Sequence, residues 1–138
     1  MKPTVHTRVA LHVRGSDVEP ELVAERLELS ATASHRRGDA VGGDDPNERH
    51  KDGWCYFTSH AEIARDAPFD VHAAWLLVRL EPHRSMLLGY ADRGWRLLLE
   101  VTTWTDAAAG GPLVSAETMR RLADLALPVR WTTIHTRR

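Results

Sequence analysis

The chain has 138 residues, of which 43% are hydrophobic and 27% charged, as expected for one folded domain rather than a disordered chain. Its formal net charge of −1 argues against a nucleic-acid binder or a membrane-surface protein that relies on bulk charge. The sequence lacks an N-terminal apolar signal core and an apolar run of about eighteen residues, the length of a transmembrane helix. Because Cys55 is the single cysteine, an intrachain disulfide is excluded, and we expect one cytoplasmic domain over residues 1–138.

The first part of the chain predicts a strand, a helix and a short second strand. Apolar or threonine side chains occupy every second position from residue 5 to residue 13, which is the period of a half-buried strand. Asp17 or Ser16 can cap a helix that continues to about residue 29, and Pro20 suits its first turn. We interpret the polar stretch 31–37 as a weak edge strand.

The polar segment 38–53 contains the run Gly-Gly-Asp-Asp-Pro-Asn and is predicted to be a long flexible loop. The next five residues, Trp-Cys-Tyr-Phe-Thr at 54–58, favour a strand. A slip of one residue in its pairing would exchange the two faces of this strand. The sequence therefore leaves open whether Tyr56 or Cys55 points into the core.

The second half of the chain predicts two further helical regions, each followed by a strand. A helix over residues 70–80 ends or kinks near Pro82, a helical turn covers 85–91, and period-two alternation returns at 95–104. A small-residue loop at 106–112 leads to a helix that Ser115 caps and Pro128 stops, and a strand follows at 129–135. The predicted core side chains of this last helix are Met119, Leu122, Ala123 and Ala126.

The order of these elements predicts an α+β fold. Its first six members follow the βαββαβ order of a ferredoxin-like α/β sandwich, to which a C-terminal helix and strand are added. If the helices cover one face of the sheet, the opposite face is open or is covered by a partner, and the polar sides of several strands meet there. The residues expected on that open face are His12, Arg14, Tyr56, Glu100, Trp104 and Arg130.

Aromatic side chains among Arg and His are typical of binding surfaces, because Trp and Tyr bury a large area and keep a polar group. The alternative interpretation is an ordinary solvated sheet face, or one that the long loop or a second copy covers. Both interpretations stay open at this point.

Other kinds of site have weaker support. The eight histidines do not show the spacing of a metal site, and the loop lacks the ligand order of a calcium site, so we expect neither metal nor other cofactor. Cys55 lies within a strand, where a small buried side chain is the more common role than a nucleophile. Ser59 and His60 are neighbours in sequence, which does not create a catalytic triad. We therefore predict no catalytic residue. The near-neutral charge and the lack of aromatic signature motifs argue against an RNA-binding sheet.

Several short motifs mark the boundaries of the predicted elements. They are Gly15-Ser16-Asp17, Glu19-Pro20-Glu21-Leu22, Leu27-Glu28-Leu29, Arg36-Arg37-Gly38-Asp39, Trp54, and Leu122-Ala123-Asp124-Leu125 before Val129. Together they span about residues 8–136 and resemble a bacterial family described as domain of unknown function 4279, in which Lys often stands at the position of Arg37. The resemblance implies a small cytosolic α+β domain and brings no established activity. Some small bacterial families of this size are immunity proteins encoded beside toxin genes, so an immunity-type role is suggested by analogy only.

The Arg36-Arg37-Gly38-Asp39 turn has two interpretations. In the structural one, Gly38 supplies a positive φ, Asp39 bonds the turn backbone, and an arginine pairs with a carboxylate of the first helix. In the functional one, Arg37 and Asp39 lie at the rim of the open face and help to bind an anionic ligand. We favour the structural interpretation and keep both residues as candidates.

Three hypotheses for function follow. The first is a non-catalytic binding or accessory domain, of the immunity type, that binds a partner protein or a small anionic ligand on the open face. The second is a small enzyme or ligand-binding protein of secondary metabolism with a pocket on that face. The third is a homodimer that uses the face for self-association. The candidate binding residues are His12, Arg14, Arg37, Asp39, Tyr56, Trp104 and Arg130.

Overall fold

Strands and helices alternate along most of the chain in a computed structural model, which describes residues 5–106 and 113–136. The predicted 106–112 loop lies almost wholly outside the described residues. The elements are, in chain order, β1 (Val5–Gly15), α1 (Pro20–Leu27), β2 (Ala33–His35), β3 (Gly53–Thr58), the 3₁₀ turn η1 (Ser59–Ala61), α2 (Phe69–Leu80), η2 (Glu81–His83), α3 (Arg84–Asp92), β4 (Arg96–Thr105), α4 (Ala116–Asp124) and β5 (Val129–His135).

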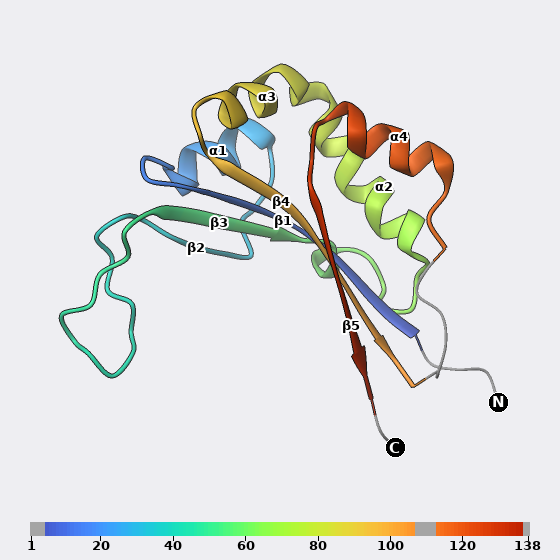
Figure 1. Cartoon of the computed structure of the whole chain (residues 1–138), viewed down its shortest axis with the longest axis horizontal. Coiled ribbons are helices and arrows are strands. Elements are labelled where there is room, and N and C mark those ends of the chain that lie inside the picture. The colour runs from blue at the N-terminus through green and yellow to red at the C-terminus, as the bar shows by residue number, and fades with distance from the viewer. Residues whose placement is uncertain (1–4, 107–112, 137–138) are drawn as a thin grey trace.

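The strands form one open mixed sheet in the order β2-β3-β1-β4-β5. All neighbouring pairs are antiparallel except β4 and β5, which are parallel. The helices lie on one side of the sheet and leave its other face uncovered (Figure 1). The prediction of an α+β fold is confirmed, whereas the strand order by itself does not establish the ferredoxin-like topology. No helix among the described residues is long and apolar enough to cross a membrane.

The core lies between the sheet and the helices. Val9, Leu11 and Val13 of β1 are fully buried, and they belong to the same cluster of buried side chains as Leu76 and Leu80 of α2. Because successive side chains of a strand point to opposite faces, burial of the odd positions turns the even positions of β1 to the open face. The predicted two-sided strand is therefore confirmed.

The register of β3 is decided by its pairing with β1. His12 is opposite Tyr56 and Val13 is opposite Cys55, so Cys55 points into the core and Tyr56 to the open face. At the start of β3, Gly53 lies against the backbone of residue 18, where a Cβ would be 1.9 Å from the Val18 carbonyl oxygen. Only glycine leaves room for this close approach.

The first helix differs from its prediction. It begins at Pro20, its N-cap residue makes no side-chain cap bond, and it ends where Glu28 adopts a positive φ of 55°. Asp17 does not cap this helix; it accepts hydrogen bonds from the Trp95 indole and from Arg93. The predicted capping role was wrong because a long-range partner, outside the local pattern, binds this carboxylate.

The last helix confirms the predicted cap but not the predicted core face. The Ser115 hydroxyl accepts from the Thr118 backbone N–H at 3.1 Å. Met119, however, is 54% exposed, whereas Thr118 and Leu122 are buried. Consecutive helical residues are about 100° apart, so placing Thr118 on the core side turns Met119 toward solvent.

The predicted long loop extends beyond the sheet between β2 and β3 (Figure 1). Its two arms are bonded to each other, since the His50 N–H donates to the Asp39 carbonyl at 2.9 Å and Ala40 forms a β-bridge with Arg49. The segment thus contains backbone pairing that its polar composition does not predict. Its flexibility stays a prediction.

Candidate functional site

Five of the predicted site residues lie on the open face of the sheet. His12 and Arg14 come from β1, Tyr56 from β3, Trp104 from β4 and Arg130 from β5. Residues directly opposite one another on neighbouring strands point to the same side of the sheet, and so does every second residue along one strand. By these two rules the strand pairing puts all five side chains on one face. Sequence periodicity therefore predicted the face correctly, and the structure adds how the residues are arranged on it.

His12 lies at the centre of the face with both ring nitrogens directed at neighbours. The Trp54 indole can only donate, so its 3.1 Å bond makes His12 Nδ1 an acceptor and leaves the ring proton on Nε2. Nε2 is buried and lies 3.5 Å from Glu100 Oε1, which is longer than a good hydrogen bond. Burial lowers the pKa of His12, and Glu100 opposes this shift. The ring is thus a neutral, packed part of the face, without a nitrogen open to a substrate.

Arginines and aromatic rings pack together beside His12. The guanidinium of Arg8 lies 5.3 Å from the centroid of the Trp104 ring and 5.9 Å from that of Tyr56. The same guanidinium is 3.4 Å from Glu100. Cation–π contacts of this kind orient an arginine while they leave part of its charge available. The face is therefore a mixed aromatic and cationic surface rather than a simply solvated one.

A second polar group joins the face to the long loop. Arg14 is 3.3 Å from Asp52, and the same carboxylate is 3.3 Å from His35 Nε2. The ring of His35 stacks on that of His50, with 3.4 Å between the centroids. Burial opposes ionisation of Asp52, but the bonds from His35 and Arg14 leave its pKa lowered. The base of the loop is thereby fixed against one end of the open face.

A cavity of about 520 Å³ opens where this face meets the start of β5; we call it the arginine notch. Arg96 and Arg130 line it and make no hydrogen bond or ion pair with any described residue. Arg14 is bound to Asp52, and Glu100 is shared with Arg8. The notch therefore holds two guanidinium groups that make no direct contact with a described carboxylate, although Glu100, the register partner of Arg130 on β4, lines the same cavity. Its full lining is His12, Arg14, Ala91, Arg96, Leu97, Leu98, Glu100, Ala126, Pro128 and Arg130.

Trp104 lies away from the notch, at the other end of the face. It lines a smaller hollow of about 280 Å³ with His6, Arg8 and His60. His60 is held in place, because its Nε2 is 3.0 Å from the Thr7 carbonyl oxygen. Of the five predicted residues on the face, three line the notch, Trp104 lines this hollow, and Tyr56 lines neither.

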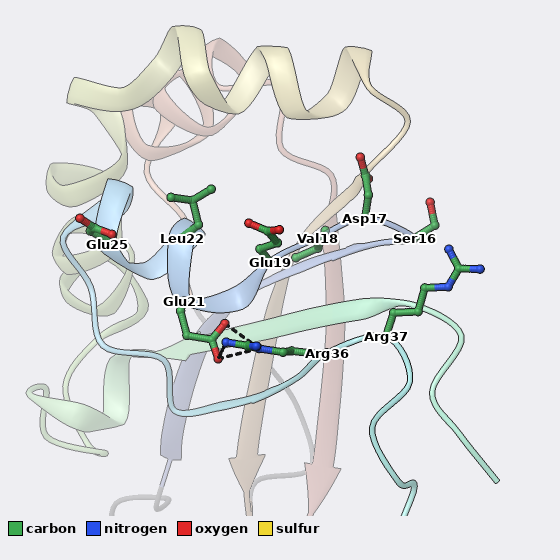
Figure 2. Close-up of a pocket in the computed structure, with 9 residues that line it drawn as sticks. All are labelled: Ser16, Asp17, Val18, Glu19, Glu21, Leu22, Glu25, Arg36 and Arg37. Atoms are coloured by element: carbon green, nitrogen blue, oxygen red, sulfur yellow. Dashed lines mark hydrogen bonds and ion pairs between the residues drawn. The ribbon is translucent and has the colours of Figure 1, made fainter.

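Arg37 and Asp39 lie outside the open face. Asp39 Oδ2 accepts from the Arg36 N–H at 2.8 Å, and Gly38 has a φ of 91°, as the structural interpretation of the turn requires. The Arg36 guanidinium pairs with Glu21 of α1 through two nitrogens, Nε at 3.1 Å and Nη2 at 2.9 Å from the carboxylate, while Arg37 extends away from that pair (Figure 2). Arg37 lines a cavity of about 620 Å³ between this turn and α1, whose other charged groups are mostly carboxylates. The turn thus joins the β2 end to α1.

Potential nucleophiles lie in the core. Cys55 is fully buried, and this burial raises the pKa of its thiol to about 12. Ser59 and His72 form a pair with Oγ 2.6 Å from Nδ1, but both are fully buried, and the Ser59 Oγ also accepts from the Val9 N–H. This hydroxyl extends the hydrogen bonding of β1 where β3 ends. In the described parts of the chain, no three His, Cys, Asp or Glu side chains cluster as metal ligands would.

Three contributors to the face were missed in the sequence: Trp54, Arg8 and Arg96. Each lies an even number of residues from a chosen residue on the same strand, so the two-residue period of a strand could have predicted it. His35 and Asp52 carried no such signal, because a bend in the loop brings them together.

Comparison with known proteins gives one result. A family model described as domain of unknown function (DUF4279) matches residues 4–135, nearly the whole chain. Neither the curated proteins nor the solved structures include a match. The motifs noted in the sequence and the extent of this match lead to the same assignment: the chain belongs to the DUF4279 family.

Proposed function

We propose that this protein is a non-catalytic binding domain whose open sheet face binds an acidic segment of a partner protein. The observation that carries this proposal is the arginine notch, where Arg96 and Arg130 have no carboxylate partner among the described residues. Guanidinium groups bind carboxylates through paired, charge-assisted hydrogen bonds. A carboxylate that enters the notch would neutralise a charge that the described part of the chain leaves open.

The rest of the face favours a protein partner. Beside the notch, Trp54 and Tyr56 follow one another along β3, opposite residues of β1 that line the notch. The guanidinium of Arg8 connects Tyr56 to Trp104 at the far end of the face. Trp, Tyr and Arg are the residues that most often carry the binding energy of protein interfaces. A surface of this extent and composition suits an extended acidic segment better than a single small molecule.

The state of the polar side chains supports binding over catalysis. Both nitrogens of His12 face neighbouring side chains, and Cys55, Ser59 and His72 are sealed in the core. General acid–base chemistry needs a titrating group within reach of the substrate. The immunity-type role expected from the sequence would make the acidic partner a toxin.

The second candidate is a protein that binds a small anionic molecule. The volume of the notch, about 520 Å³, is in the range of small-molecule sites, and Leu97, Leu98 and Pro128 provide apolar walls. This candidate shares the chemistry of the notch and differs in what supplies the anion.

The test measures binding of a hexaglutamate peptide and of inorganic phosphate by isothermal titration calorimetry. For the peptide, we expect the double variant Arg96→Gln, Arg130→Gln to bind at least about tenfold more weakly, since each charge-assisted bond contributes about 1.5–3 kcal/mol. Arg120→Gln, on the exposed side of α4, is the matched control and should bind as the parent does. Equal affinity of parent and double variant would refute the notch as the site. Binding of phosphate without binding of the peptide would favour the small-molecule candidate.

We further propose that β1 to β4, with α1 and the α2–α3 region, form a ferredoxin-like unit to which α4 and β5 are added. The antiparallel order β2-β3-β1-β4 supports this assignment. In this arrangement β5 belongs to the added part, and the notch lies where the added part joins the unit.

A further inference from the structure

The last strand, β5, is an edge strand with all seven residues exposed to solvent. Its side chains include Val129, Trp131 and Ile134, which are 42%, 39% and 40% exposed. Its sequence, Val-Arg-Trp-Thr-Thr-Ile-His, is rich in β-branched and aromatic residues and contains neither Pro nor Lys. Natural sheets usually protect such an edge with prolines, lysines, bulges or a covering segment. β5 is therefore an unprotected edge strand that is available to pair with another strand.

The hydrogen bonding of β5 identifies which of its backbone groups are free. The Leu99 N–H donates to the Pro128 carbonyl, and the Thr136 N–H donates to the Thr105 carbonyl. In a parallel pair, every second residue directs its N–H and C=O to the neighbouring strand, so the even-numbered residues of β5 bond to β4. The odd-numbered residues direct theirs to the outer edge, where no described residue pairs with them. These outward residues are Val129, Trp131, Thr133 and His135.

We infer that β5 pairs with β5 of a second copy of this chain, antiparallel and centred on Thr132. In this register, Trp131 is opposite the partner's Thr133 and Val129 is opposite the partner's His135. All these residues point their backbone groups outward, so four hydrogen-bonded residue pairs form across the two copies. Each pair exchanges two main-chain hydrogen bonds, roughly eight in total. The free edge is thus satisfied along the whole strand.

A second copy fits this edge because β5 is complementary to itself in that register. The one permanently charged side chain of the strand, Arg130, lies opposite Ile134, so no two like charges meet. Trp131, which packs 5.2 Å from the Phe69 ring, keeps this contact on the helix side of the sheet. Twofold symmetric dimers use the same patch on both copies, as this register does. The pairing joins two sheets edge to edge and is independent of the proposed use of the notch.

The first test measures mass by light scattering and crosslinking of an engineered cysteine. At the twofold axis, the two Thr132 residues form a non-hydrogen-bonded pair, in which the Cα atoms are about 4.5 Å apart. That separation suits a disulfide. We expect a dimer for the parent chain, and we expect Thr132→Cys to form a disulfide-linked dimer under mild oxidation. Thr133→Cys is the matched control, because its side chain faces Trp131 and not its own copy. The native Cys55 is buried and does not compete.

The second test separates this edge from any other dimer interface. Thr132→Lys and Thr132→Glu should each weaken the dimer by about fivefold or more, because two like charges meet at the axis. An equimolar mixture of the two variants should restore it as a heterodimer. A monomeric parent chain at millimolar concentration would overturn the inference. A dimer that both variants leave unchanged, or equal crosslinking of Thr133→Cys, would overturn it as well.

Discussion

Replacing Ser59 by alanine tests whether the buried Ser59–His72 pair is structural. Oγ of Ser59 accepts from the Val9 N–H at 3.0 Å and lies 2.6 Å from His72 Nδ1. All three residues are fully buried. If the Ser59 hydroxyl had no structural role, its removal would change the free energy of unfolding very little. The size of the decrease therefore measures how much these hydrogen bonds stabilise the core.

The magnitude follows from the two partners that the substitution leaves unpaired. A buried donor or acceptor without a partner costs about 1–3 kcal/mol. Ser59→Ala leaves both the Val9 N–H and His72 Nδ1 without this partner, so the free energy of unfolding should fall by about 2–6 kcal/mol. That is a large share of the roughly 5–15 kcal/mol typical of a domain.

Urea unfolding followed by circular dichroism measures this change, with Ser34→Ala as the control. Ser34 is exposed in the edge strand β2, so its replacement should change the unfolding free energy by less than about 0.5 kcal/mol. An equally small effect for Ser59→Ala would refute the structural role. A more stable Ser59→Ala protein would instead indicate a strained functional pair.

Two further predictions concern stability. Burial lowers the pKa of His72 below its ordinary value of 6.5, so the unfolded chain takes up a proton before the folded one does. The stability that neutral His72 contributes is therefore complete above pH 6.5 and is lost as the pH falls toward the folded pKa. The urea midpoint of unfolding should decrease as the pH is lowered from 8 to 5, and it should decrease less steeply in His72→Gln. A flat or inverse profile would contradict this sign. Gly53→Ala should lower the unfolding free energy by about 3 kcal/mol, because its Cβ would meet the Val18 carbonyl oxygen at 1.9 Å. In the same thermal melts Gly43→Ala should be nearly neutral, since nothing lies within 4 Å of that position; similar melting of the two variants would show that β3 can shift at little cost.

The sequence determined the local elements and their two faces. Alternation along residues 5–14 and 95–104 predicted which side of β1 and β4 would be buried, because a strand turns successive side chains to opposite sides whatever it pairs with. The Ser115 cap and the bonds of the Gly38–Asp39 turn were also predictable, since each involves groups only a few residues apart.

Only the tertiary structure decided which distant residues meet. Asp17 binds Trp95 across 78 positions and so is not a helix cap, and Ser59 pairs with His72 instead of its neighbour His60. Asp17 lies in the connection between β1 and α1, and Ser59 and His72 lie in η1 and α2, so these meetings depend on how loops and helices pack against the sheet. A local sequence pattern carries little information about which distant elements pack together.

The arginine notch illustrates the same division. Periodicity predicts that Arg14 and Arg130 share a face, and it could also have included Arg96. That these three arginines line one cavity depends on the parallel pairing of β5 with β4, which begins at Leu99 and leaves the start of β4 uncovered. The sequence by itself determined the side on which each side chain lies; the packing of the added strand decided which charges were left without partners.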